Sequence, residues 1–426
     1  MHNNGTMLRT PSSLTFMARE ARFGAANYRP LPVVLTRGEG AYLWDVEGKR
    51  YIDMMSAYSA VSFGHGHPRL LKALSEQAAR LALTSRAVHT DVLGKFMEAV
   101  CQVTGMDKVL PMNSGAEAVE TAIKAARKWG HKVKRIPEGQ ARIIVAKGNF
   151  AGRTTTIISF SSEFQYKDGF GPLTPGFDAV PYGDAKAFER TITPATAAFL
   201  VEPIQGEGGI IVPPDGYLRE VRALCDRHNV LMICDEVQTG LGRTGELFAV
   251  DHDGVKPDAI LLGKALGGGL LPVSAFVARA ELMNVFNPGD HGSTFGGNPL
   301  TAAVATEALA VLHDERLVER SAEMGAHMMR RLKSIDQPAI RDVRGRGLLV
   351  GVDIDPAWCG GREFCERLLQ GGVLTKETRE SVVRLAPPLV IERQTLDHAI
   401  DVIEATLEGL QQPHLRTTPA VEPLNA

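Results

Sequence analysis

The stretch Val230-Leu-Met-Ile-Cys-Asp-Glu-Val-Gln238 places a short apolar run directly before two carboxylates and an amide. The run Val230–Cys234 is typical of a strand that is buried on both faces, as in a parallel sheet. Similar runs recur in the central part of the chain and alternate with segments of helical periodicity. This alternation predicts an open α/β sheet whose ligands lie at the carboxyl ends of its strands. The other predicted strands are Arg142–Ala146, Ala198–Val201 and Ala259–Leu262, and the predicted covering helices are Ser114–Trp129 and Tyr217–His228.

A different pattern begins near Leu309, where we expect one long amphipathic helix. It is followed by predicted strands at Gly347–Asp353 and Val382–Leu385 and by a predicted helix at Gly361–Leu369. We interpret this part as a smaller α+β domain, with Thr15 to about Ser59 packing beside it. The expected divisions are an N-terminal segment over residues 15–60, a large α/β domain over 61–305, the small domain over 306–411 and a disordered tail over 412–426.

The composition is that of a globular protein with no overall attraction to polyanions. The 426 residues include 47 Lys plus Arg and 49 Asp plus Glu, a formal net charge of −2, which gives no global attraction to nucleic acid or to an anionic membrane. No apolar run reaches the ~20 residues of a spanning helix, and Met1–Ser13 lacks the apolar region of a signal peptide. The five cysteines are scattered, so we expect reduced thiols and a cytoplasmic location.

Two residues at predicted strand ends carry the first chemical signals. Asp235 could hold a metal, act as a base or accept a hydrogen bond from a protonated ring nitrogen, although a strand end that reaches solvent would look the same. Lys264 follows a buried strand and lies among glycines and apolar residues. Partial desolvation lowers the pKa of a lysine and supplies the neutral amine that forms a Schiff base with an aldehyde, but a solvated lysine fits this position equally well.

Two further motifs suit a phosphate group. Ser114 and Glu117 match a capping box at a helix start, and Gly115 and Ala116 leave bare backbone N–H groups at the same helix end, where an anion binds. The loop His291–Asn298 presents small hydroxyl residues among glycines, which by itself is a weak signal. Together the four motifs are consistent with one ligand, pyridoxal 5′-phosphate, whose ring nitrogen would pair with Asp235 and whose aldehyde carbon would bond to Lys264.

With Asp235-Glu-Val-Gln-Thr-Gly240 twenty-nine residues before Lys264, and with Ser114-Gly-Ala-Glu-Ala118 upstream, the chain resembles the class III, fold-type I aminotransferases. The resemblance implies a large domain with a mostly parallel seven-stranded sheet and a smaller α+β domain. It implies that Asp235 keeps the pyridinium nitrogen protonated, and that Lys264 binds the cofactor covalently and then moves the substrate proton.

The same resemblance assigns the remaining cofactor contacts. Gln238 would contact the O3′ side of the ring, Phe150 would stack on the ring face, and the helix start at Ser114, Gly115 and Ala116 would hold the phosphate. Thr294, with Ser293, would contact the phosphate of the neighbouring subunit, so the active unit would be at least a dimer.

Within this family the chain resembles the ornithine aminotransferases over roughly Phe16 to Leu410. The resemblance implies transfer of the δ-amino group of L-ornithine to 2-oxoglutarate, giving glutamate and glutamate 5-semialdehyde, which cyclises to pyrroline-5-carboxylate. It rests on the motifs Asn27–Pro30, Leu43–Gly48, Ser56–Val61, Gly148–Thr154, Asp168–Pro172, Val201–Glu207 and Val383–Pro388.

The resemblance also assigns the substrate contacts. Arg153 would bind the α-carboxylate of ornithine and Tyr28 its α-ammonium group, with Tyr58 shaping the pocket. Arg384 would bind the carboxylate next to the reacting carbon of 2-oxoglutarate. Glu207 would pair with Arg384 while ornithine is bound and release it for 2-oxoglutarate.

Some positions depart from the family pattern, and other functions stay open. Phe295 replaces a tyrosine, Gly208 replaces a frequent alanine, and Val88–Thr90 replaces a more aromatic stretch. Alternatives are acetylornithine aminotransferase, 4-aminobutyrate or another ω-amino acid aminotransferase, a dinucleotide-binding oxidoreductase and a non-catalytic homologue. We expect no metal, because His65 and His67 form an isolated His-x-His pair.

Overall fold

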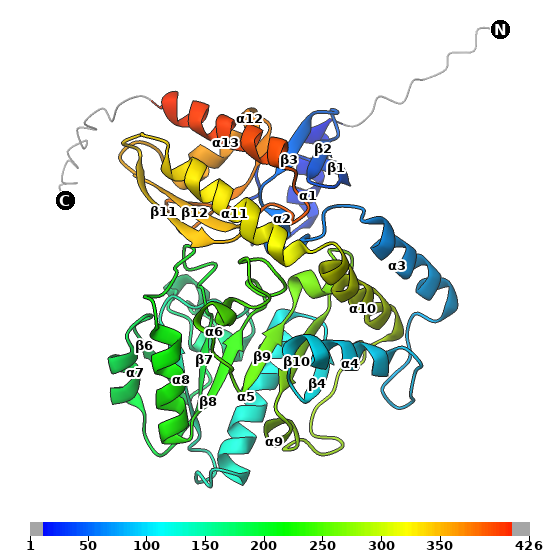
Figure 1. Cartoon of the computed structure of the whole chain (residues 1–426), viewed down its shortest axis with the longest axis vertical. Helices are drawn as coiled ribbons and strands as arrows, with labels where there is room; N and C mark the ends of the chain where they lie inside the picture. Colours follow the sequence, from blue (N-terminus) through cyan, green and yellow to red (C-terminus); the bar gives the residue numbers. More distant parts are fainter. Residues whose placement is uncertain (1–11, 411–426) are drawn as a thin grey trace, which may run out of the picture.

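The computed structural model describes residues 12–410, in which a large sheet with covering helices is joined to two smaller sheets (Figure 1). The tail predicted over 412–426 lies outside the described residues. Among residues 12–410, no helix combines the length and the hydropathy needed to cross a bilayer.

The seven-stranded sheet confirms the predicted mostly parallel architecture. Six of its strands run in the same direction, and only β10 is antiparallel to its neighbours. Two predicted strands agree with the structure at both ends, β5 and β9, whereas β10 was not among the predicted strands. In spatial order the strands are β4 (Lys108–Met112), β10 (Ser274–Ala278), β9 (Ala259–Leu262), β8 (Leu231–Asp235), β7 (Thr196–Val201), β5 (Arg142–Ala146) and β6 (Phe177–Val180).

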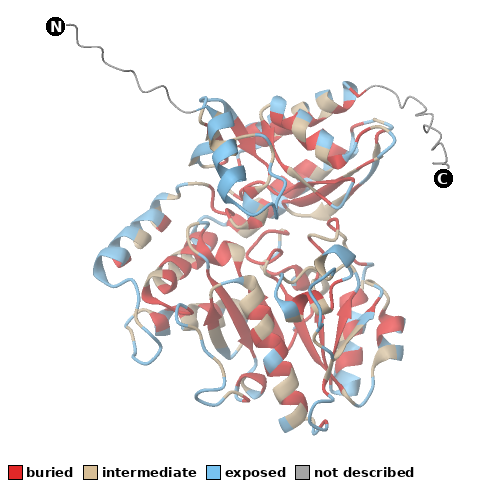
Figure 2. Ribbon diagram, turned by 180° about the vertical axis from the view of Figure 1, so that it is seen from behind, coloured by how far each residue is buried: buried red, intermediate tan, exposed pale blue. Residues whose placement is uncertain are grey.

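The central strands of this sheet are buried, as their red colour in Figure 2 shows, and their alternating side chains pack on both faces. In β5, Ile143 and Val145 pack on the side covered by α5, whereas Ile144 packs on the side covered by α8. Burial on both faces explains why these strands are continuous apolar runs in the sequence. The helices of this part are α3 (Pro68–Arg80), α4 (Leu93–Thr104), α5 (Gly115–Lys132), α6 (Thr155–Ser159), α7 (Ala185–Thr191), α8 (Tyr217–His228), α9 (Ala280–Met283) and α10 (Pro299–Asp314), with 3₁₀ turns η1 (Phe164–Tyr166), η2 (Ala249–Asp253) and η3 (Lys264–Gly267).

The two smaller sheets bring the two ends of the described chain together. Parallel pairing of Val373 with Ile52 joins a C-terminal strand to the N-terminal strands. One sheet has the order β1 (Leu35–Glu39), β2 (Tyr42–Asp45), β3 (Arg50–Asp53), β13 (Val373–Leu374), and the other has the order β11 (Ile340–Arg346), β12 (Leu349–Ile354), β15 (Val382–Leu385), β14 (Lys376–Thr378). Their helices are α1 (Ser13–Phe23), α2 (Ser56–Ser59), α11 (Leu317–Lys333), α12 (Gly361–Gln370) and α13 (Arg393–Glu408).

The single long helix predicted from about Leu309 is wrong. Helix α10 already begins at Pro299, with the side chain of Asn298 capping it, and it ends at Asp314. Arg316 then adopts a left-handed conformation, with φ of 50°, and α11 begins at the next residue. The apolar periodicity continues across this break, because both helices bury a face, and the periodicity therefore did not reveal it.

The turn between β11 and β12 fits against α11 because Gly325 of this helix lacks a side chain. A Cβ at Gly325 would lie 2.2 Å from the carbonyl carbon of Gly347, and Gly347 itself has φ of +54°. Such a contact cannot be relieved by rotating a side chain, since both partners are backbone atoms.

We therefore expect Gly325→Ala to lower the free energy of unfolding by about 2 kcal/mol or more, as overpacking does in a filled interior. Chemical denaturation followed by circular dichroism measures this. Gly94→Ala is the matched control, because Gly94 also lies in a helix but a Cβ there would meet no atom within 4 Å. It should be neutral or stabilising by up to about 1 kcal/mol. Equal effects of the two substitutions would contradict the prediction.

Candidate active site

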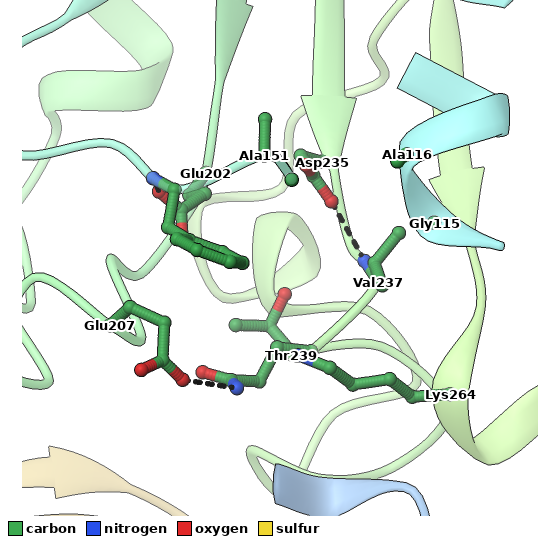
Figure 3. A pocket seen from close by; sticks show the side chains of 12 residues that line it. Gly115, Ala116, Ala151, Glu202, Glu207, Asp235, Val237, Thr239 and Lys264 are labelled. Carbon is green, nitrogen blue, oxygen red and sulfur yellow. Dashed lines mark hydrogen bonds between the residues drawn. The ribbon is translucent and has the colours of Figure 1, made fainter. Parts of the chain in front are cut away.

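A cavity of about 190 Å³ lies at the carboxyl edge of the seven-stranded sheet (Figure 3). Its wall is built from segments that directly follow β4, β5, β7, β8 and β9. Neighbouring parallel strands end at the same edge, which is why residues far apart in the sequence meet there. The lining residues are Gly115, Ala116, Phe150, Ala151, Gly152, Glu202, Glu207, Asp235, Val237, Gln238, Thr239 and Lys264.

Asp235 is the last residue of β8 and lines this cavity. Its side chain is buried, and its Oδ1 accepts a hydrogen bond of 3.0 Å from the backbone N–H of Val237. Burial raises the pKa of Asp235 to about 6, against the opposing effects of that hydrogen bond and of Lys264. The next residue, Glu236, is a different kind of carboxylate, because it accepts hydrogen bonds from Thr239 and from the N–H of Val250. Of the two adjacent acids, the cavity receives Asp235.

Lys264 follows β9 and lines the same cavity as Asp235. Desolvation lowers its pKa to about 8, and the negative charge of Glu207 partly opposes this shift. The backbone of Lys264 has φ of 43°, a left-handed conformation that non-glycine residues seldom adopt and that is found most often at functional sites. The site therefore holds a lysine that readily becomes a neutral amine.

The start of α5 resolves the two interpretations of its capping box. The Ser114 side chain accepts a hydrogen bond from the N–H of Glu117, and the Glu117 carboxylate accepts from the N–H groups of Ser114 and Asn113. Burial alone would raise the pKa of Glu117, but these hydrogen bonds keep it below its usual value. Glu117 thus caps the helix, and Gly115 and Ala116, whose N–H groups come first in the helix, line the cavity. The cap and an anion site can coexist.

An ion pair between a buried arginine and a half-buried glutamate borders the cavity on the side of the smaller sheets. Arg384 lies in β15 with only 1% of its side chain exposed, and its guanidinium donates to the carboxylate of Glu207. Burial alone would raise the pKa of Glu207, but Arg384 and Lys264 hold it below its usual value. The same carboxylate accepts from Nε2 of Gln238 at 3.3 Å, and the Arg384 guanidinium lies 4.8 Å from the ring centre of Tyr58. The predicted residues Glu207, Arg384, Gln238 and Tyr58 therefore form one connected group.

Four other predicted residues lie outside the cavity wall. The guanidinium of Arg153 is exposed and lies 3.4 Å from the ring centre of Tyr166 and 5.6 Å from that of Phe150. Tyr28 is 76% exposed in the single chain. Ser293 accepts a hydrogen bond of 2.9 Å from the Asn113 side chain near the start of α5, whereas Thr294 is exposed. Tyr28, Arg153, Ser293 and Thr294 do not line the cavity of this chain.

The most informative residue that sequence reasoning missed is Glu202, which follows β7. Its carboxylate accepts the N–H of Phe150 at 3.0 Å and the N–H of Gly206 at 3.3 Å. Burial and the nearby Asp235 raise the pKa of Glu202 to about 8. Its position was available as a signal, because an acid directly after a buried parallel strand lies at the ligand edge of the sheet. Ala151, Gly152, Val237 and Thr239 were also missed, and their residue types carry no such signal.

The two histidines of the His-x-His pair bind separate carboxylates. Nε2 of His65 lies 2.8 Å from Asp53, and Nε2 of His67 lies 3.0 Å from Glu315. Within residues 12–410, no group of three or more His, Cys, Asp or Glu side chains is arranged to hold a metal ion.

A lysine and an aspartate at the ends of neighbouring parallel strands, facing a helix start, are the arrangement of pyridoxal-phosphate-dependent transferases. The family model described as Aminotransferase class-III matches residues 23–407. The chain belongs to this family of enzymes.

Individual relatives are similar over nearly the whole chain. The ornithine aminotransferase of Brevibacillus brevis (strain 47) is 55% identical over 386 residues, which cover 91% of this chain and 96% of that protein. A structure of the ornithine aminotransferase from Toxoplasma gondii, with partial occupancy of PLP at its active site, superposes with a TM-score of 0.92 at 46% identity and covers 94% of this chain and 95% of that one. The acetylornithine aminotransferase from Elizabethkingia anophelis gives a TM-score of 0.85 at 47% identity and covers 94% of this chain and 100% of that one.

Class III aminotransferases depend on pyridoxal 5′-phosphate, and the residues of the cavity fit this cofactor. The side-chain oxygen of Gln238 is buried and accepts no hydrogen bond within the described residues. The leading N–H groups of α5 suit a phosphate, and an acid and a lysine of shifted pKa suit a ring nitrogen and an aldehyde.

The lowered pKa of Lys264 leads to a pH-dependence prediction for protein prepared without cofactor. A lysine is cationic below its pKa and nucleophilic above it, so covalent capture of added pyridoxal 5′-phosphate at Lys264 should accelerate as the pH rises through about 8. Borohydride reduction followed by peptide mapping measures the adduct at each pH. Adducts at the exposed Lys72 provide an internal reference. Identical pH profiles at the two lysines would contradict the prediction.

Proposed function

We propose that this enzyme transfers the δ-amino group of L-ornithine to 2-oxoglutarate, giving glutamate and glutamate 5-semialdehyde, which cyclises to pyrroline-5-carboxylate. The observation that carries the proposal is the ion pair between buried Arg384 and half-buried Glu207, which lines the same cavity as Lys264. A cation that can be either neutralised or freed suits an enzyme whose two substrates carry different groups next to the reacting carbon. Ornithine reacts at a CH₂ group without a neighbouring carboxylate, and 2-oxoglutarate reacts beside one.

The cofactor-binding roles in this proposal follow the cavity wall. When bound, pyridoxal 5′-phosphate supplies a carbonyl that condenses with amines and a ring that takes up electrons. Lys264 binds it covalently and carries the proton between the two reacting carbons, while Asp235 accepts a hydrogen bond from the ring nitrogen. The helix start at Ser114, Gly115 and Ala116 binds the phosphate, Phe150 covers a ring face and Gln238 contacts the ring oxygen.

In this proposal the Glu207 carboxylate is a reversible ion-pair partner of Arg384. While Glu207 holds the guanidinium, the α-carboxylate of ornithine finds no free cation near the ring, so the δ-amine is presented instead. Movement of Glu207 frees Arg384 for 2-oxoglutarate. The guanidinium is suited to this second partner, because its buried Nε and Nη2 donate to no acceptor within the described residues.

The far end of ornithine is assigned to Arg153 and Tyr28. The Arg153 guanidinium lies over the rings of Tyr166 and Phe150, which orients its planar face and leaves its N–H groups available to a carboxylate. Tyr28 supplies a hydroxyl for the α-ammonium group, and Tyr58 limits the width of the pocket between Arg384 and the cofactor.

We further propose that the active unit is a homodimer in the cytoplasm. Thr294 is exposed on the glycine-rich loop and Phe295 beside it is 55% exposed, which supports burial of this loop against a second copy. Thr294 and Ser293 would then contact the phosphate bound by the partner subunit. The five cysteines form no disulfide and four of them are buried, which supports a reducing compartment.

The second candidate is transfer from N-acetylornithine, which the similarity to the Elizabethkingia anophelis enzyme favours. That donor has a blocked α-amine, so it has no ammonium group for Tyr28 to bind.

Steady-state kinetics with ornithine, N-acetylornithine and 4-aminobutyrate test the donor. We expect kcat/KM to be at least tenfold higher for ornithine, since an unmet hydrogen bond to a charged group costs about 1.5–3 kcal/mol. A higher kcat/KM for N-acetylornithine would overturn the choice of substrate. The same comparison with 2-oxoglutarate, pyruvate and oxaloacetate tests the acceptor.

The substitution Glu207→Gln tests whether the ion pair with Glu207 keeps Arg384 from binding ornithine. Without its carboxylate, Arg384 is free to bind the α-carboxylate of ornithine, so the fraction of product formed by transfer of the α-amine should rise roughly tenfold. Nuclear magnetic resonance distinguishes the two cyclised products. Glu307 lies on α10, binds Arg69 and does not line the cavity, so Glu307→Gln should leave the product ratio unchanged. An unchanged product ratio in Glu207→Gln would reject the proposed role of the ion pair.

A further inference from the structure

The segment Ser56–Ser59 is a left-handed turn made entirely of non-glycine residues. Its four φ angles are 48°, 46°, 61° and 72°. Side chains with a Cβ crowd the backbone in this conformation, and consecutive left-handed residues are rarer still. Such a turn persists only where its surroundings enforce it. The turn is labelled α2 in Figure 1, where it lies between the smaller sheets and the large sheet.

Asp53 holds the chain where it enters this turn. It is the last residue of β3, and only 1% of its surface is exposed. Its Oδ1 accepts the N–H of Met55 at 2.9 Å and the N–H of Ser56 at 2.7 Å, while its Oδ2 lies 2.8 Å from Nε2 of His65. Hydrogen bonds to a buried carboxylate are among the stronger ones in proteins. They fix the chain at the point where it enters the left-handed turn.

The turn presents Tyr58 to the active site. The Tyr58 ring lies 4.8 Å from the guanidinium carbon of Arg384, and its carbonyl oxygen accepts from Nε2 of Gln238 at 3.5 Å. The strand that carries Arg384 is tied to the same place, because the N–H of Ala386 donates to the carbonyl of Met54 at 2.8 Å. Tyr58 and Arg384 are thus held from one short segment.

The end of the turn is fixed by a second buried charge. Arg243 is fully buried and donates to the hydroxyl of Ser62 at 2.9 Å and to the carbonyl of Pro387. Desolvation lowers the pKa of Arg243 to about 9, and the carboxylate of Asp53 opposes this shift. Asp53 therefore holds the start of the segment, and Arg243 holds the chain three residues after its end, at Ser62.

We propose that Asp53 is a positioning residue for the amine-accepting half-reaction: its carboxylate holds the left-handed turn that keeps Tyr58 against Arg384. The inference rests on the proposed function, in which Arg384 binds 2-oxoglutarate after Glu207 has moved away. At that stage the Tyr58 ring is the contact that still orients the guanidinium within the chain. During the ornithine half-reaction Glu207 holds Arg384 as well, so a loosened turn has less effect.

The matched control for Asp53 is Asp45, a second buried carboxylate in the same sheet. Its Oδ1 also accepts two backbone N–H groups, from Glu47 at 3.0 Å and Lys49 at 2.8 Å, and its Oδ2 accepts the hydroxyl of Tyr51. It holds the turn that leads into β3, at the opposite end of this strand from Asp53. Asp53→Ala and Asp45→Ala therefore remove similar sets of hydrogen bonds. If Asp53→Ala does not fold, Asp53→Asn retains the shape, removes the charge and should change each measurement in the same direction.

The first measurement is hydrogen exchange in protein without cofactor or substrate, read from peptides that span residues 54–62. Exchange in this segment should accelerate at least tenfold in Asp53→Ala and stay unchanged in Asp45→Ala. The second is single-turnover kinetics of each half-reaction. In Asp53→Ala the apparent Kd for 2-oxoglutarate should rise about tenfold, the scale of a lost cation–π contact, while the ratio of the maximal rate constant to the apparent Kd for ornithine changes less than about twofold. In a Tyr58→Leu background, Asp53→Ala should have little further effect on either value.

Equal losses in both half-reactions, full additivity with Tyr58→Leu, or unchanged exchange over residues 54–62 would each overturn the positioning role. Failure of the proposed function looks different, because the unmodified enzyme would then not consume 2-oxoglutarate. In that case the exchange measurement alone decides whether Asp53 holds the turn.

Discussion

The structure depends on keeping charged groups together in one cavity at the carboxyl edge of the large sheet. The cavity is lined by Lys264, Asp235, Glu202 and Glu207. Desolvation favours the neutral form of each group: it acts to raise the pKa of the three carboxyl groups and to lower the pKa of the lysine. Such groups are costly to bury one at a time and tolerable only as a mutually compensating set. The parallel sheet makes the set possible, because it delivers each charged side chain at the end of a buried apolar strand.

Arg384 shows how the smaller sheets contribute to a site that the large sheet builds. It belongs to β15, yet its charge partner Glu207 lines the cavity of the large sheet. The contact is supported from the N-terminal segment, where Tyr58 lies against the guanidinium. Three separate parts of the chain thus contact one side chain, and a change in any of them should alter the orientation of its guanidinium.

Much of the large sheet could be predicted from the sequence, because strands buried on both faces appear as uninterrupted apolar runs. The strands β5, β9 and β15 and the helix α8 agree with prediction at both ends. The antiparallel β10 has the same apolar composition but no directional signal, and the break at Arg316 interrupts the backbone without interrupting the apolar pattern. In the site, Lys264 and Asp235 were predictable from strand-end position, whereas Glu202 was missed although the same argument covers it.

The parallel pairing of Val373 with Ile52 has a consequence for biosynthesis. The two partners are separated by 321 positions, so β3 emerges from the ribosome long before β13 exists to cover its edge. Until then the hairpin of β1 to β3 exposes unpaired backbone groups, which are a route to association with other nascent chains. Charged side chains of both signs, among them Arg37, Glu39 and Arg50, lie on these strands, a feature that discourages premature strand addition.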